Sequence, residues 1–203
     1  MTATKRPILE MVKLGAILAL YAAASCAVLA VVNNVTSPVI AQNQKNKANA
    51  AMKSVFAEAD NFDLIEDFDT TGGDAAISID EMYAAKKDGK LVGAVAKVSG
   101  PTYDHATLTV GLDLAGMITG VQFLENTDSP GFGLKASDPT FKLENGKTFY
   151  GQFTGKKAAD GFIAGETFDA ISGATITSKA VGEILEKGTA CISEYLEEHK
   201  NEQ

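Results

Sequence analysis

The chain has 203 residues, which is enough for one modest domain and an appendage. With 45% hydrophobic and 22% charged residues it has the composition of a folded protein, which excludes wholesale disorder. A formal net charge of -8 provides no basic stripe, and we therefore expect no nucleic-acid partner.

Cysteine and histidine are too scarce for most metal chemistry. Cys26 and Cys191 stand far apart, and no C-x-x-C motif supplies ligands for an iron–sulfur cluster, a c-type haem or a structural zinc. His105 and His199 are also too few for an imidazole site. We therefore expect no metal site, and an organic cofactor if the protein carries out redox chemistry.

Residues 14–32 form an apolar run without charge. As a helix rising ~1.5 Å per residue, the run would cover roughly 28 Å, close to the thickness of a bilayer core. The alternative, a cleaved signal peptide, would have a shorter apolar region ending at a small-x-small site. Lys5, Arg6 and Lys13 precede the run, and positive charge favours the cytoplasmic side. We predict a single span with the N-terminus in the cytoplasm.

The span leads into a polar stalk, residues 33–44, in which Pro38 is expected to break any helix. From residue 45 to residue 59, apolar positions recur at helical spacing and predict an amphipathic helix. Its apolar face would consist of Ala48, Met52, Val55, Phe56 and Ala59.

A strand pattern begins at Ile77 and Ile79, because the apolar period changes to two. Asp88-Gly89 is typical of a tight hairpin turn, since both positions tolerate positive φ. The further strands are expected at residues 91–98, 106–112 and 118–124, with turns at residues 86–90 and 113–116. Together these elements predict an antiparallel sheet.

A constrained loop follows at residues 129–133 (SPGFG). Gly131 and Gly133 allow the backbone to approach a bound group closely, although an ordinary tight turn has the same composition. Residues 175–198 then show a helical period with one charged face, which predicts an amphipathic helix. The predicted fold class is α+β, an antiparallel sheet with packed helices.

Residues 169–175 (DAISGAT) immediately precede that helix. Ser172 and Thr175 could simply cap it, because hydroxyl side chains bond the free N–H groups at a helix start. The same N–H groups and the helix dipole also attract phosphate oxygens. Gly173 and Ala174 leave room beside the Thr175 hydroxyl. No activating base stands beside Thr175, so we expect no catalytic residue here.

This segment resembles the D-x-x-[ST]-G-A-T signature of proteins that receive covalent FMN from a dedicated flavin transferase. The wider string DAISGATITSKAV, the N-terminal span and residues 128–133, which are similar to E-T-P-G-L-G, together resemble the G subunit of Rnf electron-transport complexes. The C subunit of sodium-pumping NADH:quinone oxidoreductase is homologous. The chain departs from this pattern at Asp128, Ser129 and Phe132, which replace Glu, Thr and Leu, and at Asn126, where histidine is common.

The resemblance implies a membrane-anchored electron-transfer subunit with FMN esterified through its phosphate to Thr175. Its complex would couple electron transfer between ferredoxin and NAD to movement of sodium ions or protons, and the subunit would have no catalysis of its own. The implied partners are other integral-membrane and redox subunits and, during maturation, the flavin transferase, at the inner membrane of a prokaryote. The flavin site would consist of Thr175, Ser172, Gly173, Ala174, Thr177, Gly131 and Gly133.

Three alternatives stay open. The chain could be a stand-alone extracytoplasmic flavinylated reductase or carrier, or the homologous subunit of the sodium-pumping enzyme. It could also be a non-redox, membrane-tethered assembly module in which Ser172 and Thr175 only cap a helix. In the flavoprotein interpretation, Thr175 is favoured over Thr177 because the two point to opposite sides of a helix. The expected organisation is a cytoplasmic tail at residues 1–13, the span at 14–32, the stalk at 33–44 and an extracytoplasmic FMN-binding domain at 45–203.

Overall fold

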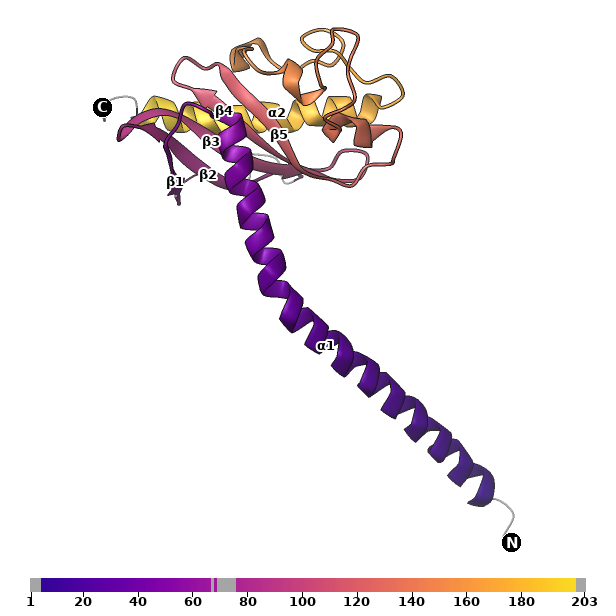
Figure 1. Cartoon of the computed structure of the whole chain (residues 1–203). Coiled ribbons are helices and arrows are strands. Elements are labelled where there is room, and N and C mark those ends of the chain that lie inside the picture. The colour runs from indigo at the N-terminus through magenta and orange to yellow at the C-terminus, as the bar shows by residue number, and fades with distance from the viewer. Residues whose placement is uncertain (1–4, 67, 69–75, 200–203) are drawn as a thin grey trace. The chain divides into compact units, whose positions relative to one another are not determined.

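The structure, a computed structural model, describes residues 5–66, 68 and 76–199. The chain divides into two compact units, residues 1–46 and 47–203, and each is described by itself (Figure 1). The helices and strands are α1 (Lys5–Val55), β1 (Asn61–Ile65), β2 (Ser78–Lys87), β3 (Lys90–Gly100), β4 (Ala106–Asp113), β5 (Ile118–Asn126) and α2 (Thr175–His199). Three short 3₁₀ helices lie between β5 and α2: η1 (Gly133–Ser137), η2 (Tyr150–Gln152) and η3 (Ala158–Asp160).

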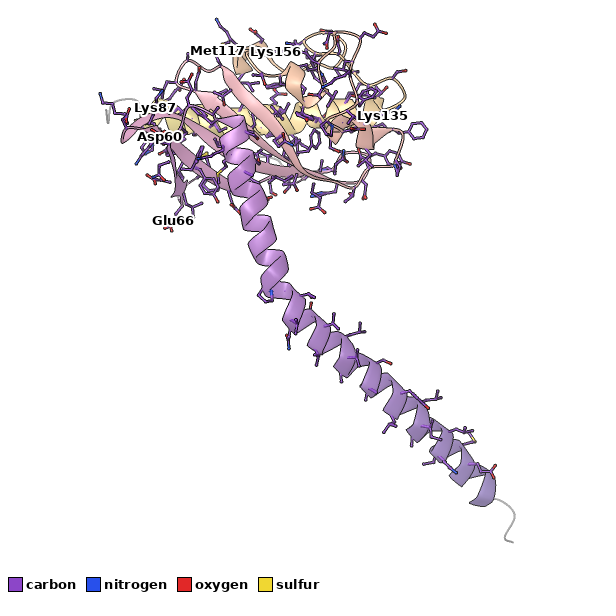
Figure 2. The ribbon with its side chains drawn as sticks, in the orientation of Figure 1. Asp60, Glu66, Lys87, Met117, Lys135 and Lys156 are labelled. Carbon is purple, nitrogen blue, oxygen red and sulfur yellow. The ribbon has the colours of Figure 1, made fainter. Side chains whose placement is uncertain are left out.

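The described residues of the first unit, residues 5–46, all belong to helix α1. Its segment Glu10–Pro38 has a mean hydropathy of 2.3 and is the one helical segment of the described chain that is long and apolar enough to cross a membrane. Side chains project from this helix along its length (Figure 2). Large apolar ones are exposed, including Leu18 and Leu20 at 70% each. Of the expected tail, residues 5–13 belong to this helix and residues 1–4 lie outside the described part.

Pro38 does not end the helix, so the prediction of a break there is wrong. A proline inside a helix removes one N–H bond to the preceding turn. Neighbouring hydroxyls add bonds in the same region: Thr36 Oγ1 donates to Val32 O at 2.9 Å, and Ser37 Oγ donates to Asn33 Oδ1 at 3.4 Å. The expected stalk is therefore helical.

Five strands form one antiparallel sheet in the order β1-β2-β3-β4-β5, so each strand pairs with its neighbour in sequence. This confirms the predicted fold class. The β2–β3 turn contains Asp88 and Gly89 at φ values of 50° and 79°, as the turn residues predicted. Strand β1 has no counterpart among the predicted elements.

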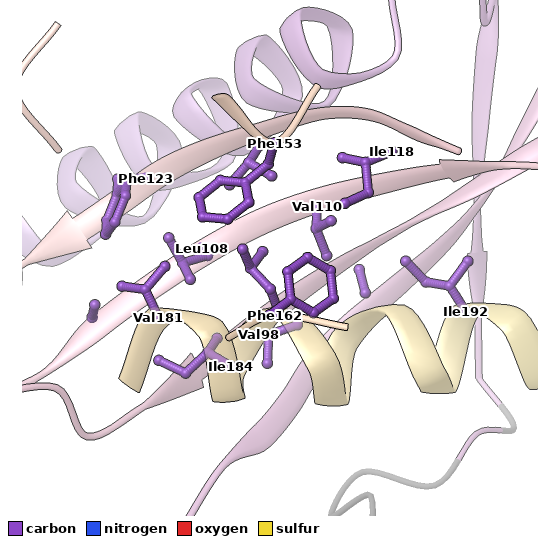
Figure 3. Close-up of a cluster of buried hydrophobic side chains, with 14 of the residues drawn as sticks. Val98, Leu108, Val110, Ile118, Phe123, Phe153, Phe162, Val181, Ile184 and Ile192 are labelled. Atoms are coloured by element: carbon purple, nitrogen blue, oxygen red, sulfur yellow. The ribbon is translucent and has the colours of Figure 1, made fainter. Parts of the chain in front are cut away.

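Helix α2 covers one face of this sheet, against β3 and β4 (Figure 3). The buried cluster between them joins side chains of both strands, of α2 and of the loops between β5 and α2. Its members include Val98, Leu108, Val110, Phe153, Phe162, Val181, Ile184 and Ile192. The amphipathic stripe that predicted α2 is thus the surface that the helix buries.

The last residues of α1, which belong to the second unit, cover the opposite face. Val55 and Phe56 lie directly over glycines of three strands. A Cβ atom at Gly111 would lie 2.8 Å from Val55 Cγ1, and one at Gly120 would lie 2.9 Å from the Val55 carbonyl oxygen. The glycines therefore make this close approach possible. The helix ends at Val55, although Phe56 and Ala59 beyond it are buried as the pattern predicted.

Candidate cofactor site at the start of helix α2

The segment before α2 alternates between buried and exposed residues. Ile171 and Ala174 are buried at 1% and 6% exposure, whereas Asp169, Ser172 and Thr175 are exposed. The Ala174 N–H donates to Ile171 O at 3.0 Å and closes a turn in which Gly173 has φ of 81°. Since residues other than glycine rarely adopt this backbone conformation, Gly173 permits the turn that leads into the helix.

Gln152 holds the start of this segment from inside the domain. Its side chain is buried, Nε2 donates to Asp169 O at 3.1 Å, and Oε1 accepts from Asp169 N–H at 2.8 Å. The Ser178 hydroxyl holds the middle by accepting from Ile171 N–H at 3.0 Å. Both polar ends of the Gln152 amide are thus paired, as buried polar groups require. The segment is a fixed part of the fold.

The neighbouring loop between η2 and α2 is fixed to the sheet. Ile118 N–H donates to Lys156 O at 2.9 Å, beside Met117 (Figure 2). Lys156 Nζ in turn donates to the Thr167 carbonyl oxygen, and burial lowers the pKa of this lysine. These bonds position the backbone that precedes Asp169.

An open cleft of about 530 Å³ lies at the start of α2. Its wall comes from three segments: Tyr103 after β3, the loop after β5, and the first turn of α2. Tyr103, Phe132 and Ile176 expose apolar surface at its rim, with exposed fractions of 67%, 58% and 60%. The lining residues are Tyr103, Ser129, Pro130, Phe132, Gly133, Gly173, Ala174, Thr175, Ile176 and Thr177.

Five of the residues predicted to form the flavin site line this cleft together: Thr175, Gly173, Ala174, Thr177 and Gly133. Their role in binding flavin stays a prediction. Two other residues of the predicted flavin site, Ser172 and Gly131, are described in the structure but do not line the cleft. Ser172 lies exposed in the adjoining loop, and Gly131, with φ of 81°, forms the turn that returns the chain toward the cleft.

Asp128 connects the three wall segments. Its carboxylate is buried at 2% exposure and accepts hydrogen bonds from the hydroxyls of Thr102 and Thr177, each at 2.6 Å, and from Asp104 N–H at 2.8 Å. Gly133 packs against this group, since a Cβ atom there would overlap Asp128 Oδ2 and Thr177 Oγ1. In the sequence, Asp128 stood out only as a replacement for glutamate, and no signal there pointed to this role.

The cleft suits a flat aromatic group joined to a phosphate. Apolar side chains at the rim can contact a ring, and the first-turn N–H groups of α2 have no partner inside the helix and can bind anionic oxygens. Within the described residues, no group of three or more His, Cys, Asp or Glu side chains could hold a metal ion.

Comparison with known families gives matches to both units. The family profile of the FMN-binding domain matches residues 102–190, which contain the whole cleft. The profile of the RnfG N-terminal region matches residues 1–55, which include all of α1. The expected FMN-binding domain is thereby confirmed.

Individual relatives extend over most of the chain. The G subunit of the Na(+)-translocating ferredoxin:NAD(+) oxidoreductase complex of Acetobacterium woodii is 31% identical over 186 residues, which are 83% of this chain and 85% of the relative. The G subunit of the ion-translocating oxidoreductase complex of Escherichia coli K12 is 34% identical over 83% of this chain and 84% of its own. The G subunit of the proton-translocating ferredoxin:NAD(+) oxidoreductase complex of Clostridium ljungdahlii is 29% identical over 76% of each chain.

Proposed function

Because the chain belongs to the family of G subunits of ion-translocating oxidoreductase complexes, we propose that it serves such a complex as an electron-transfer subunit with FMN esterified to Thr175. The named complexes of its relatives transfer electrons between ferredoxin and NAD and translocate ions. Bound FMN would supply reversible electron transfer, while the protein binds and orients it.

One observation carries the choice of Thr175. Its side chain is exposed in the wall of the cleft, at the first turn of α2. The neighbouring hydroxyls have other roles, since Thr177 donates to Asp128 and Ser178 donates to Ala174 O at 2.9 Å. Thr175 is therefore the hydroxyl of this turn that a transferase can reach.

The other cleft residues have complementary roles in this proposal. The N–H groups of the first turn hold the phosphate oxygens, and the helix dipole favours their negative charge. Tyr103 and Phe132 provide apolar contact for the ring. Gly173 has no side chain and leaves the approach to the Thr175 hydroxyl open.

Attachment requires an activated donor, because a phosphate does not esterify an alcohol in water unaided. The Thr175 Oγ forms a bond to the phosphorus of a flavin phosphoanhydride, and the anhydride P–O bond breaks. The leaving nucleotide takes that electron pair, and the hydroxyl proton passes to a base of the flavin transferase. Asp128 already accepts from three donors, which supports placing the base on the partner enzyme.

The proposed topology has residues 14–32 in the membrane, residues 1–13 in the cytoplasm and the FMN-binding domain, residues 45–203, outside. Residues 33–44 connect the two as helix. Protease added to sealed spheroplasts should then digest the domain. Digestion only in inverted vesicles would reverse this orientation.

The proposed partners are other membrane subunits of the same complex. The relatives carry the name of one subunit within a complex, and the apolar segment of α1 offers a surface for neighbouring helices. Mild detergent extraction from native membranes should recover the chain together with those subunits. A monomer without redox partners would favour the stand-alone carrier.

The attachment is tested by producing the chain beside its flavin transferase and measuring intact mass and modified peptides. FMN should be found on the peptide that contains Thr175, and Thr175→Ala should abolish it. The variant should stay folded, because loss of a helix cap costs only about 0.5–2 kcal/mol. FMN on Thr177 or Ser172, or a covalently yellow Thr175→Ala protein, would refute the assignment.

A further inference from the structure

The geometry points to Asp128 as a positioning residue for flavin attachment: its buried carboxylate binds the Thr177 hydroxyl and so fixes the orientation of Thr175 in the cleft. This inference rests on the function proposed above. Asp128 touches neither the acceptor hydroxyl nor, in this role, the flavin. It acts through the helix turn that carries Thr175.

The two carboxylate oxygens of Asp128 serve different segments. Oδ1 accepts from the Thr102 hydroxyl at 2.6 Å and from Asp104 N–H at 2.8 Å, on either side of Tyr103. Oδ2 accepts from the Thr177 hydroxyl at 2.6 Å. One carboxylate therefore joins the segment of Tyr103 to the first turn of α2, two separate parts of the cleft wall.

These bonds belong to a strong class. Hydrogen bonds to an ionised carboxylate are shorter and about twice as strong as neutral ones. Both Asp128 and Thr177 are buried at 2% exposure, so water competes little for either group. The bond between them holds the first turn of α2 in one rotation about the helix axis.

That rotation decides where Thr175 points. Successive helical residues are ~100° apart, so fixing Thr177 toward the interior turns Thr175, two residues earlier, to the far side of the axis. The structure agrees, since Thr177 is buried and Thr175 is exposed. The Thr177 hydroxyl also donates its proton to Asp128, and this bond keeps Thr177 from competing with Thr175 as the residue that receives the flavin.

Gly133 supports the same interpretation independently of the hydrogen bonds. A Cβ atom at this position would overlap both Asp128 Oδ2 and Thr177 Oγ1. The loop after β5 therefore passes against the pair without a side chain in between. The backbone is shaped around the Asp128–Thr177 contact.

The test measures kcat and KM of flavin transfer to the purified, unmodified full-length chain, with a flavin dinucleotide as donor. Thr177→Val removes the bond to Oδ2 and leaves both bonds to Oδ1. We expect about tenfold lower kcat/KM, mostly through kcat, because the exposed acceptor segment still binds the transferase. Asp128→Ala should lower it on the order of a hundredfold, as misplacing a reacting group does.

Matched variants separate positioning from stability. Thr177→Ser restores the hydroxyl and should restore the rate. Thr189→Val removes another buried hydroxyl of α2, which donates to Leu185 O at 2.8 Å. Thr189 does not line the cleft, so this variant should leave the rate of flavin transfer unchanged. The double variant Asp128→Ala/Thr177→Val should be no slower than Asp128→Ala alone, since both remove the same contact.

The outcomes are distinguishable. If Thr177→Val accepts flavin on Thr175 at the wild-type rate, or is slowed no more than Thr189→Val, the role of Asp128 is refuted and the attachment to Thr175 stands. If the wild-type chain acquires no covalent flavin, the proposed function itself fails. Should Asp128→Ala not fold, the comparison of Thr177→Val with Thr177→Ser decides alone.

Discussion

Helix α2 and the apolar segment of α1 are both rich in large aliphatic residues, but they arrange and expose them differently. In α2, Ile184 and Leu185 are fully buried against the sheet, while charged residues occupy the outer face. In the segment Glu10–Pro38, apolar residues surround the helix, and Leu20 and Leu29 expose 70% and 68% of their surface.

The difference shows how the distribution of apolar residues around a helix determines which surroundings the helix requires. A stripe matches one protein surface, and burying it stabilises the fold by roughly 25 cal/mol per Å² of apolar area. An all-round apolar helix offers no side that water tolerates, so its surroundings must be apolar in every direction. On the proposed topology, the surroundings of the α1 segment are lipid and neighbouring membrane helices.

The largest expected effect separates the two helices by stability. Ile184→Ala leaves a cavity under α2, which should lower the free energy of unfolding of the domain by about 2–5 kcal/mol. Leu20→Ala removes an exposed side chain and should leave this free energy unchanged. Denaturant titration of the full chain in detergent, followed by hydrogen exchange of the strands, measures both. Equal losses in the two variants would contradict the comparison.

An added positive charge should affect membrane association when it is placed in the α1 segment and not when it is placed in α2. Arginine at the centre of a membrane span costs about 2.5–3.5 kcal/mol on insertion scales, so Leu20→Arg should move protein out of the membrane fraction. Glu183→Arg, on the exposed face of α2, should leave membrane association as it was. Fractionation by carbonate extraction is the measurement, and full retention of Leu20→Arg would argue against a span.

Glycines offer a smaller contrast. At Gly182 in α2, a Cβ atom would lie 2.6 Å from the Phe162 carbonyl oxygen, so Gly182→Ala should destabilise the domain by about 1–3 kcal/mol. At Gly15 in α1 nothing lies within 4 Å, and Gly15→Ala should be tolerated. Thermal unfolding of both variants tests this, and a stabilised Gly182→Ala domain would refute the close packing of α2.

The smallest effect concerns pH on the sheet face that the end of α1 covers. Burial, followed by the hydrogen bond to Glu81, raises the pKa of Tyr83 from 10.0 to about 12. The contribution of the Tyr83 hydroxyl to the free energy of unfolding is therefore complete below pH 10 and is lost as the pH rises toward 12. Because the pair is partly exposed, we expect at most about 1 kcal/mol. The stability difference between wild type and Tyr83→Phe should shrink over that range, and a constant difference would exclude the linkage.

Local patterns predicted most of the fold, and long-range pairing accounts for what they missed. The period of α2 and the Asp88-Gly89 turn are signals within a few residues. Strand β1 has only the sequence NFDLI, without a clear period, and exists by pairing with β2, where Asp63 bonds Lys86 at 2.7 Å. At Pro38 the local rule was misleading, because the helix continues on both sides.

The site divides in the same way. Thr175, the proposed acceptor, and Gly173, which leaves room beside its hydroxyl, were both predicted from one contiguous motif. Asp128 could not be predicted in this way, because its hydroxyl partners lie 26 and 49 residues away in sequence. Gln152 bonds a backbone 17 residues away, and no spacing rule connects an amide to such a partner.

The order of Asp128, Gln152 and α2 along the chain has a consequence for the timing of biosynthesis. Asp128, which bonds the first turn of α2, and Gln152, which bonds the segment before it, leave the ribosome before that helix. Ile192 and Leu196 in the last turns of α2, however, are buried in the core. Synthesis proceeds from the N-terminus, so the acceptor turn is completed only after these residues have emerged and docked. On the proposed function, flavin attachment is then a post-translational event. Nascent chains arrested before Leu196 should carry no flavin, although they already contain the whole acceptor motif.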